Sequence, residues 1–146
     1  MKLISAAWLA VALVSTAPAL AEDLANPKPD WDHPRKLVLQ LDSADPKKMN
    51  LILNNALNSQ NFYGQDNVKI AIVAFGPGLH AVLKDSPVAD RVSAAEYAHV
   101  EFLACGQTMK TMHKTVDDLL PGVTKTEAGV PTLIERQLKG WTYIAP

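Results

Sequence analysis

The sequence has little cysteine, few aromatic residues and no long apolar run after its first residues. One of the 146 residues is a cysteine, Cys105, and Phe, Trp and Tyr together make up 6% of the chain. A single thiol excludes a disulfide within the chain, so its expected use is chemical or intermolecular. After residue 21, no apolar stretch reaches the roughly 20 residues that a membrane helix needs. We therefore expect no stable membrane insertion of the mature chain.

Charge of one sign is not concentrated anywhere in the sequence. The formal net charge at pH 7 is −1, and no block of basic residues is present. Such a block is the usual electrostatic footprint of a protein that binds phosphate backbones. Nucleic acid is therefore not an expected partner, and we expect neither a cofactor nor a resident metal.

The first residues have the pattern of a secretory signal peptide. Lys2 precedes an uncharged run over residues 3–14, and the segment closes with the small-x-small pattern Ala19-Leu20-Ala21. We expect cleavage after Ala21, a periplasmic or secreted protein, and a mature chain of about the size of one compact domain. Because that compartment favours disulfides, an unpaired Cys105 indicates a free thiol, a mixed disulfide or a bond between subunits.

Residues 22–35 carry three prolines and no apolar period, which predicts an extended leader before a folded domain at residues 36–146. Residues 42–46 offer a helix cap followed by proline at the first helical position. Residues 93–96 have capping-box spacing before another helical turn. The remaining pattern predicts strands at 36–41, 68–75, 100–104, 123–126 and 141–144, and helices from 46, at 79–83, at 107–120 and at 131–139.

Strands that alternate with helices predict a three-layer, doubly wound α/β domain with a mainly parallel sheet of about five strands. Each parallel crossover is right-handed and needs a helix-length connection, so helices cover both faces. Ligands in such sheets bind at the carboxyl ends of the strands. We therefore expect the loops at residues 42–43, 76–78 and 105–108 to meet at one edge.

Four segments of the sequence resemble the DsrE/DsrF-like family. They are Asn-Asn-Ala-Leu-Asn at 54–58, Val-Ala-Phe-Gly-Pro-Gly at 73–78, Phe-Leu-Ala-Cys-Gly-Gln-Thr-Met at 102–109 and Gln-Leu-Lys-Gly-Trp-Thr-Tyr-Ile at 137–144. The resemblance implies a flavodoxin-like or Rossmann-like domain that assembles into trimers or hexamers. It also implies a sulfur-relay role, because relay members carry a persulfide on a cysteine that Cys105 matches. The signal peptide departs from the pattern, since the well-understood relay members work in the cytoplasm beside partner proteins.

The residues around Cys105 predict a reactive thiol independently of the family. A thiolate at the start of a helix meets the unpaired N–H groups of Gly106, Gln107 and Thr108 and the positive end of the helix dipole. Both lower the pKa of a cysteine and favour the form that attacks sulfane sulfur. Gly106 would also let an incoming group approach the backbone. The alternative is a buried, inert cysteine.

Other residues at the same sheet edge are candidate helpers or ligands. His80 is placed to accept the thiol proton, unless it is a solvated surface histidine. Gly76 and Gly78 could hold an anion with their amides, although a tight turn also explains them. Asn54 could reach the site from the first helix or be solvated, and Asp42 could bind a ligand or cap the following helix.

Three functions remain open from the sequence. The first is an exported sulfur-handling protein, a possible sulfurtransferase, in which Cys105 takes sulfur from a donor and passes it to an acceptor thiol. The second is a non-catalytic oligomeric module that binds a small ligand. The third is a copper(I) carrier that uses Cys105, Met109, Met112 and His113, which share one face if a helix begins at the cysteine. The alternative for Met109 and Met112 is the core-facing stripe of an ordinary helix.

Overall fold

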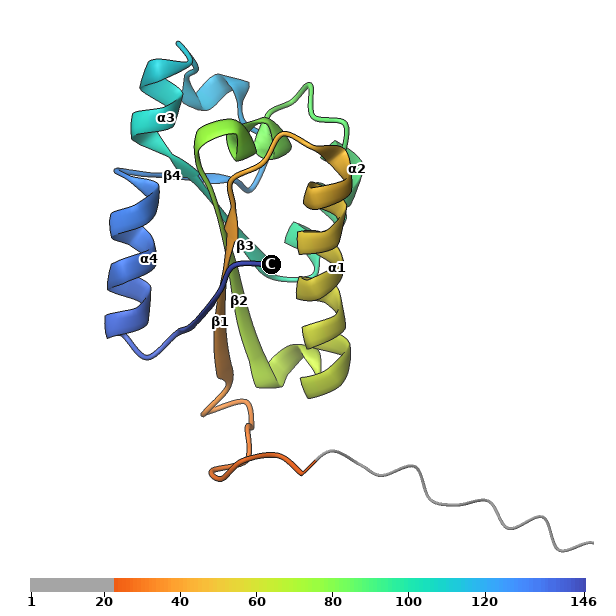
Figure 1. Ribbon diagram of the computed structural model, residues 1–146. Helices are drawn as coiled ribbons and strands as arrows, with labels where there is room; N and C mark the ends of the chain where they lie inside the picture. The colour runs from red at the N-terminus through yellow and green to blue at the C-terminus, as the bar shows by residue number, and fades with distance from the viewer. Residues whose placement is uncertain (1–22) are drawn as a thin grey trace, which may run out of the picture.

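The structure is a computed structural model that describes residues 23–146. The expected signal peptide therefore lies outside the described residues. Residues 23–34 contain no helix or strand, and the first strand begins at Arg35, one residue inside the leader expected at 22–35. Figure 1 shows this segment leaving the end of the folded body, below the first strand.

A five-stranded sheet forms the centre of the domain, and all its neighbouring strands are parallel. The strand order is β4-β3-β2-β1-β5. This arrangement confirms the predicted α/β class and the doubly wound parallel sheet. The strands are β1 (Arg35–Leu41), β2 (Val68–Ala74), β3 (Val100–Cys105), β4 (Thr124–Thr126) and β5 (Thr142–Ile144).

Helices cover both faces of the sheet. Figure 1 shows α1 and α2 on one face and α4 alone on the other, with the short α3 beyond the carboxyl end of β3. The helices are α1 (Pro46–Tyr63), α2 (Ala89–Tyr97), α3 (Gly106–Thr111) and α4 (Gly129–Leu138), and the 3-10 segments are η1 (Gln65–Asn67), η2 (Gly76–Val82) and η3 (Val116–Asp118). No helix among residues 23–146 is long and apolar enough to cross a membrane.

Helix α1 begins as its sequence predicts. The Asp45 side chain accepts a hydrogen bond from the Lys47 amide at 2.9 Å, and Pro46 occupies the first turn. The apolar positions spaced at three and four residues face the sheet, and four of them are buried: Met49, Ile52, Leu53 and Ala56. Local capping and amphipathic spacing therefore agree in fixing this helix.

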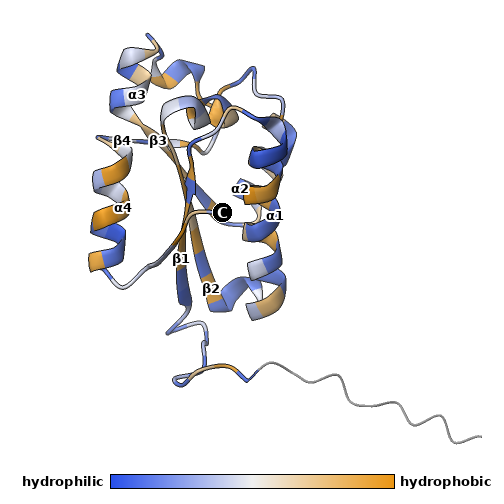
Figure 2. Ribbon diagram, viewed as in Figure 1, coloured by the Kyte–Doolittle hydropathy of each residue, from blue (hydrophilic) through white to orange (hydrophobic). Residues whose placement is uncertain are grey.

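Two apolar clusters hold the layers together. The larger lies between the sheet and α1 and α2, where Phe102 and Ile72 are fully buried. The smaller lies under α4, where Leu133 packs on Val73 and Leu103. Figure 2 shows apolar residues along the central strands and a mixture of apolar and polar residues on the helices, including apolar segments on α4. The sheet is thus buried on both faces, as the continuous apolar run of β2 predicts.

Two predicted helix boundaries are wrong. The helix expected over 107–120 ends at Thr111, because His113 adopts a positive φ of 54° and the Thr115–Asp118 capping box starts η3. The helix expected after a cap at Ser93 begins earlier, at Ala89, so Ser93 lies inside α2.

Candidate functional site

Cys105 is the last residue of β3 and the N-cap of α3. Its Sγ accepts hydrogen bonds from two backbone amides, that of Gly129 at 3.1 Å and that of Thr108 at 3.5 Å. The residue is only 5% exposed, yet it belongs to neither apolar cluster. The thiol therefore lies under the surface at the carboxyl edge of the sheet, in contact with polar backbone groups.

The pKa of Cys105 reflects two opposed effects. Burial raises the pKa, because it disfavours the charged thiolate, and this is the largest single influence. The Thr108 side chain and the amides of Thr108, Gly129 and Gln107 lower it by hydrogen bonding to the thiolate. Together these donors outweigh the burial, so the pKa lies below its ordinary value of 9.0. The structure thus favours the nucleophilic form of the sulfur.

The loops after β2 and β3 meet beside this cysteine, and the loop after β2 also contacts the end of β1. The Gly76 amide donates to the Thr108 hydroxyl at 2.9 Å, which joins the loop after β2 to the loop after β3. The Phe75 amide donates to the Leu41 carbonyl at 3.1 Å, which joins the loop after β2 to the end of β1. Thr108 therefore links the thiol to the neighbouring loop.

The glycines at this edge have structural reasons of their own. A Cβ on Gly78 would lie 2.0 Å from the Leu41 carbonyl oxygen, and a Cβ on Gly106 would lie 2.6 Å from that of Thr126. Both glycines are buried against backbone. Close chain packing, and not a ligand, accounts for their lack of a side chain.

Three predicted helpers are directed elsewhere. His80 is exposed within η2 and makes no hydrogen bond to Cys105 in the described chain. Asp42 is exposed and accepts from the Gln40 side chain at 2.7 Å. The Asn54 side chain accepts from Arg91 at 2.7 Å, an interaction between α1 and α2. Among the predicted residues, the structure gathers Gly76, Gly106, Gln107 and Thr108 around Cys105.

The copper arrangement depends on a helix that the structure does not contain. Met109 is 2% exposed and packs in the larger apolar cluster, with Met112 partly buried against it. His113 follows the end of α3 and is exposed. The premise that Cys105, Met112 and His113 share one helix face is therefore wrong, and the two methionines serve the core.

Gly129 donates the shorter of the two amide hydrogen bonds to the sulfur, and the sequence pattern does not indicate this role. It begins α4, 24 residues after Cys105 in the chain. A Cβ at this position would lie 2.8 Å from the Phe75 side chain, which explains why glycine stands there. A glycine at the start of an apolar helix was the available signal, but the sequence does not show that it contacts the thiol.

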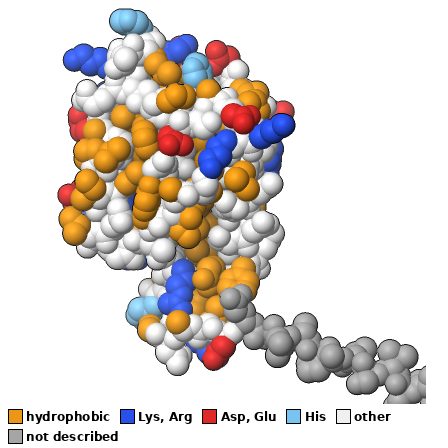
Figure 3. All heavy atoms as spheres, viewed as in Figure 1, with side chains coloured by type: hydrophobic (Ala, Val, Ile, Leu, Met, Phe, Trp, Pro, Cys, Tyr) orange, Lys and Arg blue, Asp and Glu red, His pale blue; other side chains and the backbone are white. Residues whose placement is uncertain are grey.

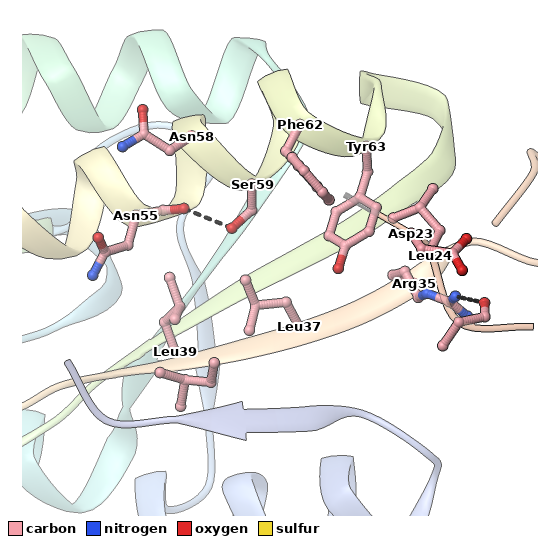
Figure 4. A pocket seen from close by; sticks show the side chains of 12 residues that line it. Asp23, Leu24, Arg35, Leu37, Leu39, Asn55, Asn58, Ser59, Phe62 and Tyr63 are labelled. Carbon is pink, nitrogen blue, oxygen red and sulfur yellow. Dashed lines mark hydrogen bonds between the residues drawn. The ribbon is translucent and has the colours of Figure 1, made fainter. Parts of the chain in front are cut away.

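A large hollow lies away from the thiol, along the amino half of β1. It has a volume of about 720 Å³ and is bounded by α1, β1, β5 and residues 23–25. Figure 4 shows Leu37 and Leu39 of β1 between the strand and the helix, with Tyr63 beside Asp23 and Leu24. A smaller hollow of about 570 Å³ lies between α3 and β4 and includes Gly106 and Gln107 in its wall.

The fold and the site define a three-layer α/β protein with one amide-bound thiol at the carboxyl edge of its sheet. The sequence model of the DsrE/DsrF-like family matches residues 36–146, so the chain belongs to this family. No curated protein matches the chain.

Two solved structures are similar to this chain. The protein of unknown function MTH1491 from Methanobacterium thermoautotrophicum is 31% identical over 77% of this chain and 99% of its own, with a TM-score of 0.74. The conserved protein of unknown function BT1422 from Bacteroides thetaiotaomicron is 22% identical, covers 76% of this chain and 94% of its own, and has a TM-score of 0.58. The second likeness shows the shared fold alone.

Proposed function

We propose that the protein handles sulfur, with Cys105 as a persulfide-carrying thiol. Its thiolate attacks a sulfane sulfur, the bond between that sulfur and its leaving group breaks, and Cys105 then passes the terminal sulfur to an acceptor thiol. The observation that carries this proposal is the pair of amides, from Gly129 and Thr108, that donate to Sγ. They supply the anion stabilisation that a nucleophilic cysteine needs, and family membership is consistent with a relay role.

The burial of the thiol sets a requirement for this function. At 5% exposure, Sγ meets a donor only when its cover moves. The link between β4 and α4 lies against the site, since Gly129 follows it directly and Thr126 is paired with Cys105. We expect this link to be the part that yields, which would also protect the thiol from oxidation in an exported protein.

Intact mass spectrometry tests the proposal. The reduced protein is incubated with polysulfide or thiosulfate, and its mass is measured before and after treatment with a reductant. We expect a gain of one sulfur atom that reduction removes and that Cys105→Ser abolishes. If no donor adds reducible sulfur to the folded wild-type protein, the sulfur-handling proposal is wrong.

A second candidate function, the binding of a small ligand, is favoured by the hollow along β1. Sites for small molecules are usually concave, mainly apolar and about 300–1,000 Å³ in volume. The hollow is within that range, and its wall combines apolar side chains of β1 and β5 with Phe62 and Tyr63 of α1. One acid, Asp23, and one base, Arg35, cancel in formal charge, which favours a neutral ligand.

Fluorescence of a neutral apolar probe, N-phenyl-1-naphthylamine, tests this second candidate. Ser59 is half-buried in the wall, so Ser59→Trp fills the hollow from α1. We expect the probe to brighten with the wild-type protein and to lose most of that signal with Ser59→Trp. Asn61→Trp, at an exposed position of α1 that does not line the hollow, is the matched control. Equal titrations of the two variants would exclude the hollow as the binding site.

We also propose that the chain works as a homo-oligomer, a trimer or a hexamer. Three apolar residues of α4, spaced four apart, are exposed: Val130, Ile134 and Leu138, at 53%, 50% and 77%. Figure 3 shows apolar side chains on the side of the molecule where α4 lies in Figure 1. A stripe of this kind on a helix opposite its buried face is typical of a surface that a second copy covers.

A further inference from the structure

The hollow between α3 and β4 lies next to the thiol in the chain. Two of the residues in its wall, Gly106 and Gln107, follow Cys105 directly, and the Gln107 amide is among the groups that lower the pKa of the thiol. On the other side, Lys125 and Glu127 come from β4 and the link to α4. The hollow is thus bounded by the two segments that enclose Cys105.

The wall of this hollow is rich in positive charge. Lys110, Lys114 and Lys125 line it, and Glu127 is its one acidic residue. Within residues 23–146, none of the three ammonium groups forms an ion pair with a carboxylate. Outside the wall, Asp118 is influenced by Lys114, since its pKa is lowered chiefly by the Thr115 amide and also by Lys114 and Lys84. The hollow therefore retains an excess of positive charge.

Lys125 is held close to the start of α3 by the packing of Gly106. A Cβ on Gly106 would lie 2.8 Å from Lys125 Cε, so the lysine stem passes directly over this glycine. Any larger residue at position 106 would displace it. The small size of Gly106 thus allows the Lys125 side chain to lie near the peptide that follows the thiol. This is a second role for the glycine, in addition to its close contact with Thr126.

We propose that this hollow binds the sulfur donor as a small oxyanion of the thiosulfate class, an inference that rests on the proposed function of Cys105. The lysines hold the sulfonate oxygens, since clefts lined by cations concentrate anions and raise the rate at which they bind. The thiolate attacks the outer sulfur of thiosulfate, the sulfur–sulfur bond breaks, and its electron pair leaves with sulfite. Cys105 then carries the outer sulfur as a persulfide anion, and no further oxidant or reductant is needed.

The rate of persulfide formation tests the inference. Lys110, Lys114 and Lys125 are replaced together by glutamine, and the loading of Cys105 by thiosulfate is followed by mass at low salt. We expect the rate to fall about tenfold, because each exposed charge contact contributes a factor of a few. The wild-type rate should also fall as salt is added, whereas that of the variant should change little.

Two controls separate a local effect from a general one. Replacing Lys36, Lys47 and Lys69 by glutamine removes the same charge from exposed positions outside the hollow and should leave the thiosulfate rate near the wild-type value. Alkylation of Cys105 by neutral iodoacetamide should be equal in all three proteins, which shows that the thiol is intact. If both triple variants load at the same rate as wild type, the inference is wrong.

Binding without chemistry distinguishes this inference from the proposed function. Sulfate, which has no sulfane sulfur, is titrated into the reduced full chain while amide signals are followed by NMR. In the wild-type protein we expect sulfate to shift the amide signals of residues 106–116 and 125–127. These shifts should be absent when Lys110, Lys114 and Lys125 are replaced by glutamine. Sulfate binding there without any persulfide would retain the anion site and refute the sulfur chemistry. Persulfide formation without sulfate binding would retain the sulfur chemistry and refute the anion site.

Discussion

At the scale of single residues, Thr108 connects the two halves of the site. Its amide donates to Cys105 Sγ, and its hydroxyl accepts from the Gly76 amide while also lowering the pKa of the thiol. Because burial alone would raise that pKa, the thiolate depends on these donors. Thr108 is therefore a positioning residue that acts through Cys105.

The substitution Thr108→Val removes the hydroxyl and keeps the shape of the side chain. We expect the pKa of Cys105 to rise, so the pH at which iodoacetamide alkylation reaches half its maximal rate moves upward from the lowered wild-type value. The free energy of unfolding should also fall by about 1 kcal/mol, because the partly buried Gly76 amide loses its acceptor. Alkylation rates across pH and denaturant titrations measure the two effects.

Thr108→Ser keeps the hydroxyl and is the matched control, so its alkylation profile should stay close to that of wild type. The lowered pKa of Cys105 also makes the stability of the fold depend on pH. A thiol whose pKa is lower in the folded state stabilises the fold fully above its unfolded pKa, and this contribution is lost as pH falls through the folded pKa. An unchanged profile in Thr108→Val would show that the hydroxyl has no influence on the thiol.

At the scale of elements, α4 combines three roles on one short helix. Its first residue, Gly129, donates to the thiol, and Leu133 packs on the sheet. Its outer face carries the exposed stripe of Val130, Ile134 and Leu138. The helix therefore connects the chemistry of the site with the surface that we propose for assembly.

The substitution Ile134→Lys places a charge in the middle of the exposed stripe. We expect the wild-type protein to sediment as a trimer or hexamer and the variant to shift toward the mass of one chain, since burying an unpaired charge at an interface is costly. Analytical ultracentrifugation measures this directly. Asn61→Lys adds the same charge at an exposed position of α1, away from the stripe, and should keep the wild-type mass. Identical masses for wild type and Ile134→Lys would exclude this face as an interface.

The elements with strong local signals could be predicted from the sequence, and those set by distant contacts could not. The start of α1 at Pro46 and the apolar run of β2 depend on neighbouring residues, so both were predicted within a residue or two. The end of α3 depends on the positive φ of His113, which no local pattern indicates. The contact from Gly129 to Cys105 joins residues on opposite sides of a crossover, so the sequence showed the thiol and not its best donor.

At the scale of the whole molecule, the parallel sheet separates two regions with different chemistry. The carboxyl ends of its strands hold the thiol and the lysine-lined hollow. The amino half of β1 borders the larger apolar hollow beside α1 (Figure 4). Because the two hollows have no lining residue in common, the variants proposed for one leave the other in place, and the sulfur and ligand hypotheses can be judged separately.

The late position of Gly129 in the chain has a consequence for biosynthesis. When Cys105 first emerges, the donor at 3.1 Å has not yet been made, because Gly129 opens α4, the helix that packs on β1, β2, β3 and β5. Until then the sulfur lacks its nearest anion-stabilising amide. The nascent polypeptide therefore lacks one of the donors to the sulfur, and the full set is present only once α4 has been made and packed on the sheet.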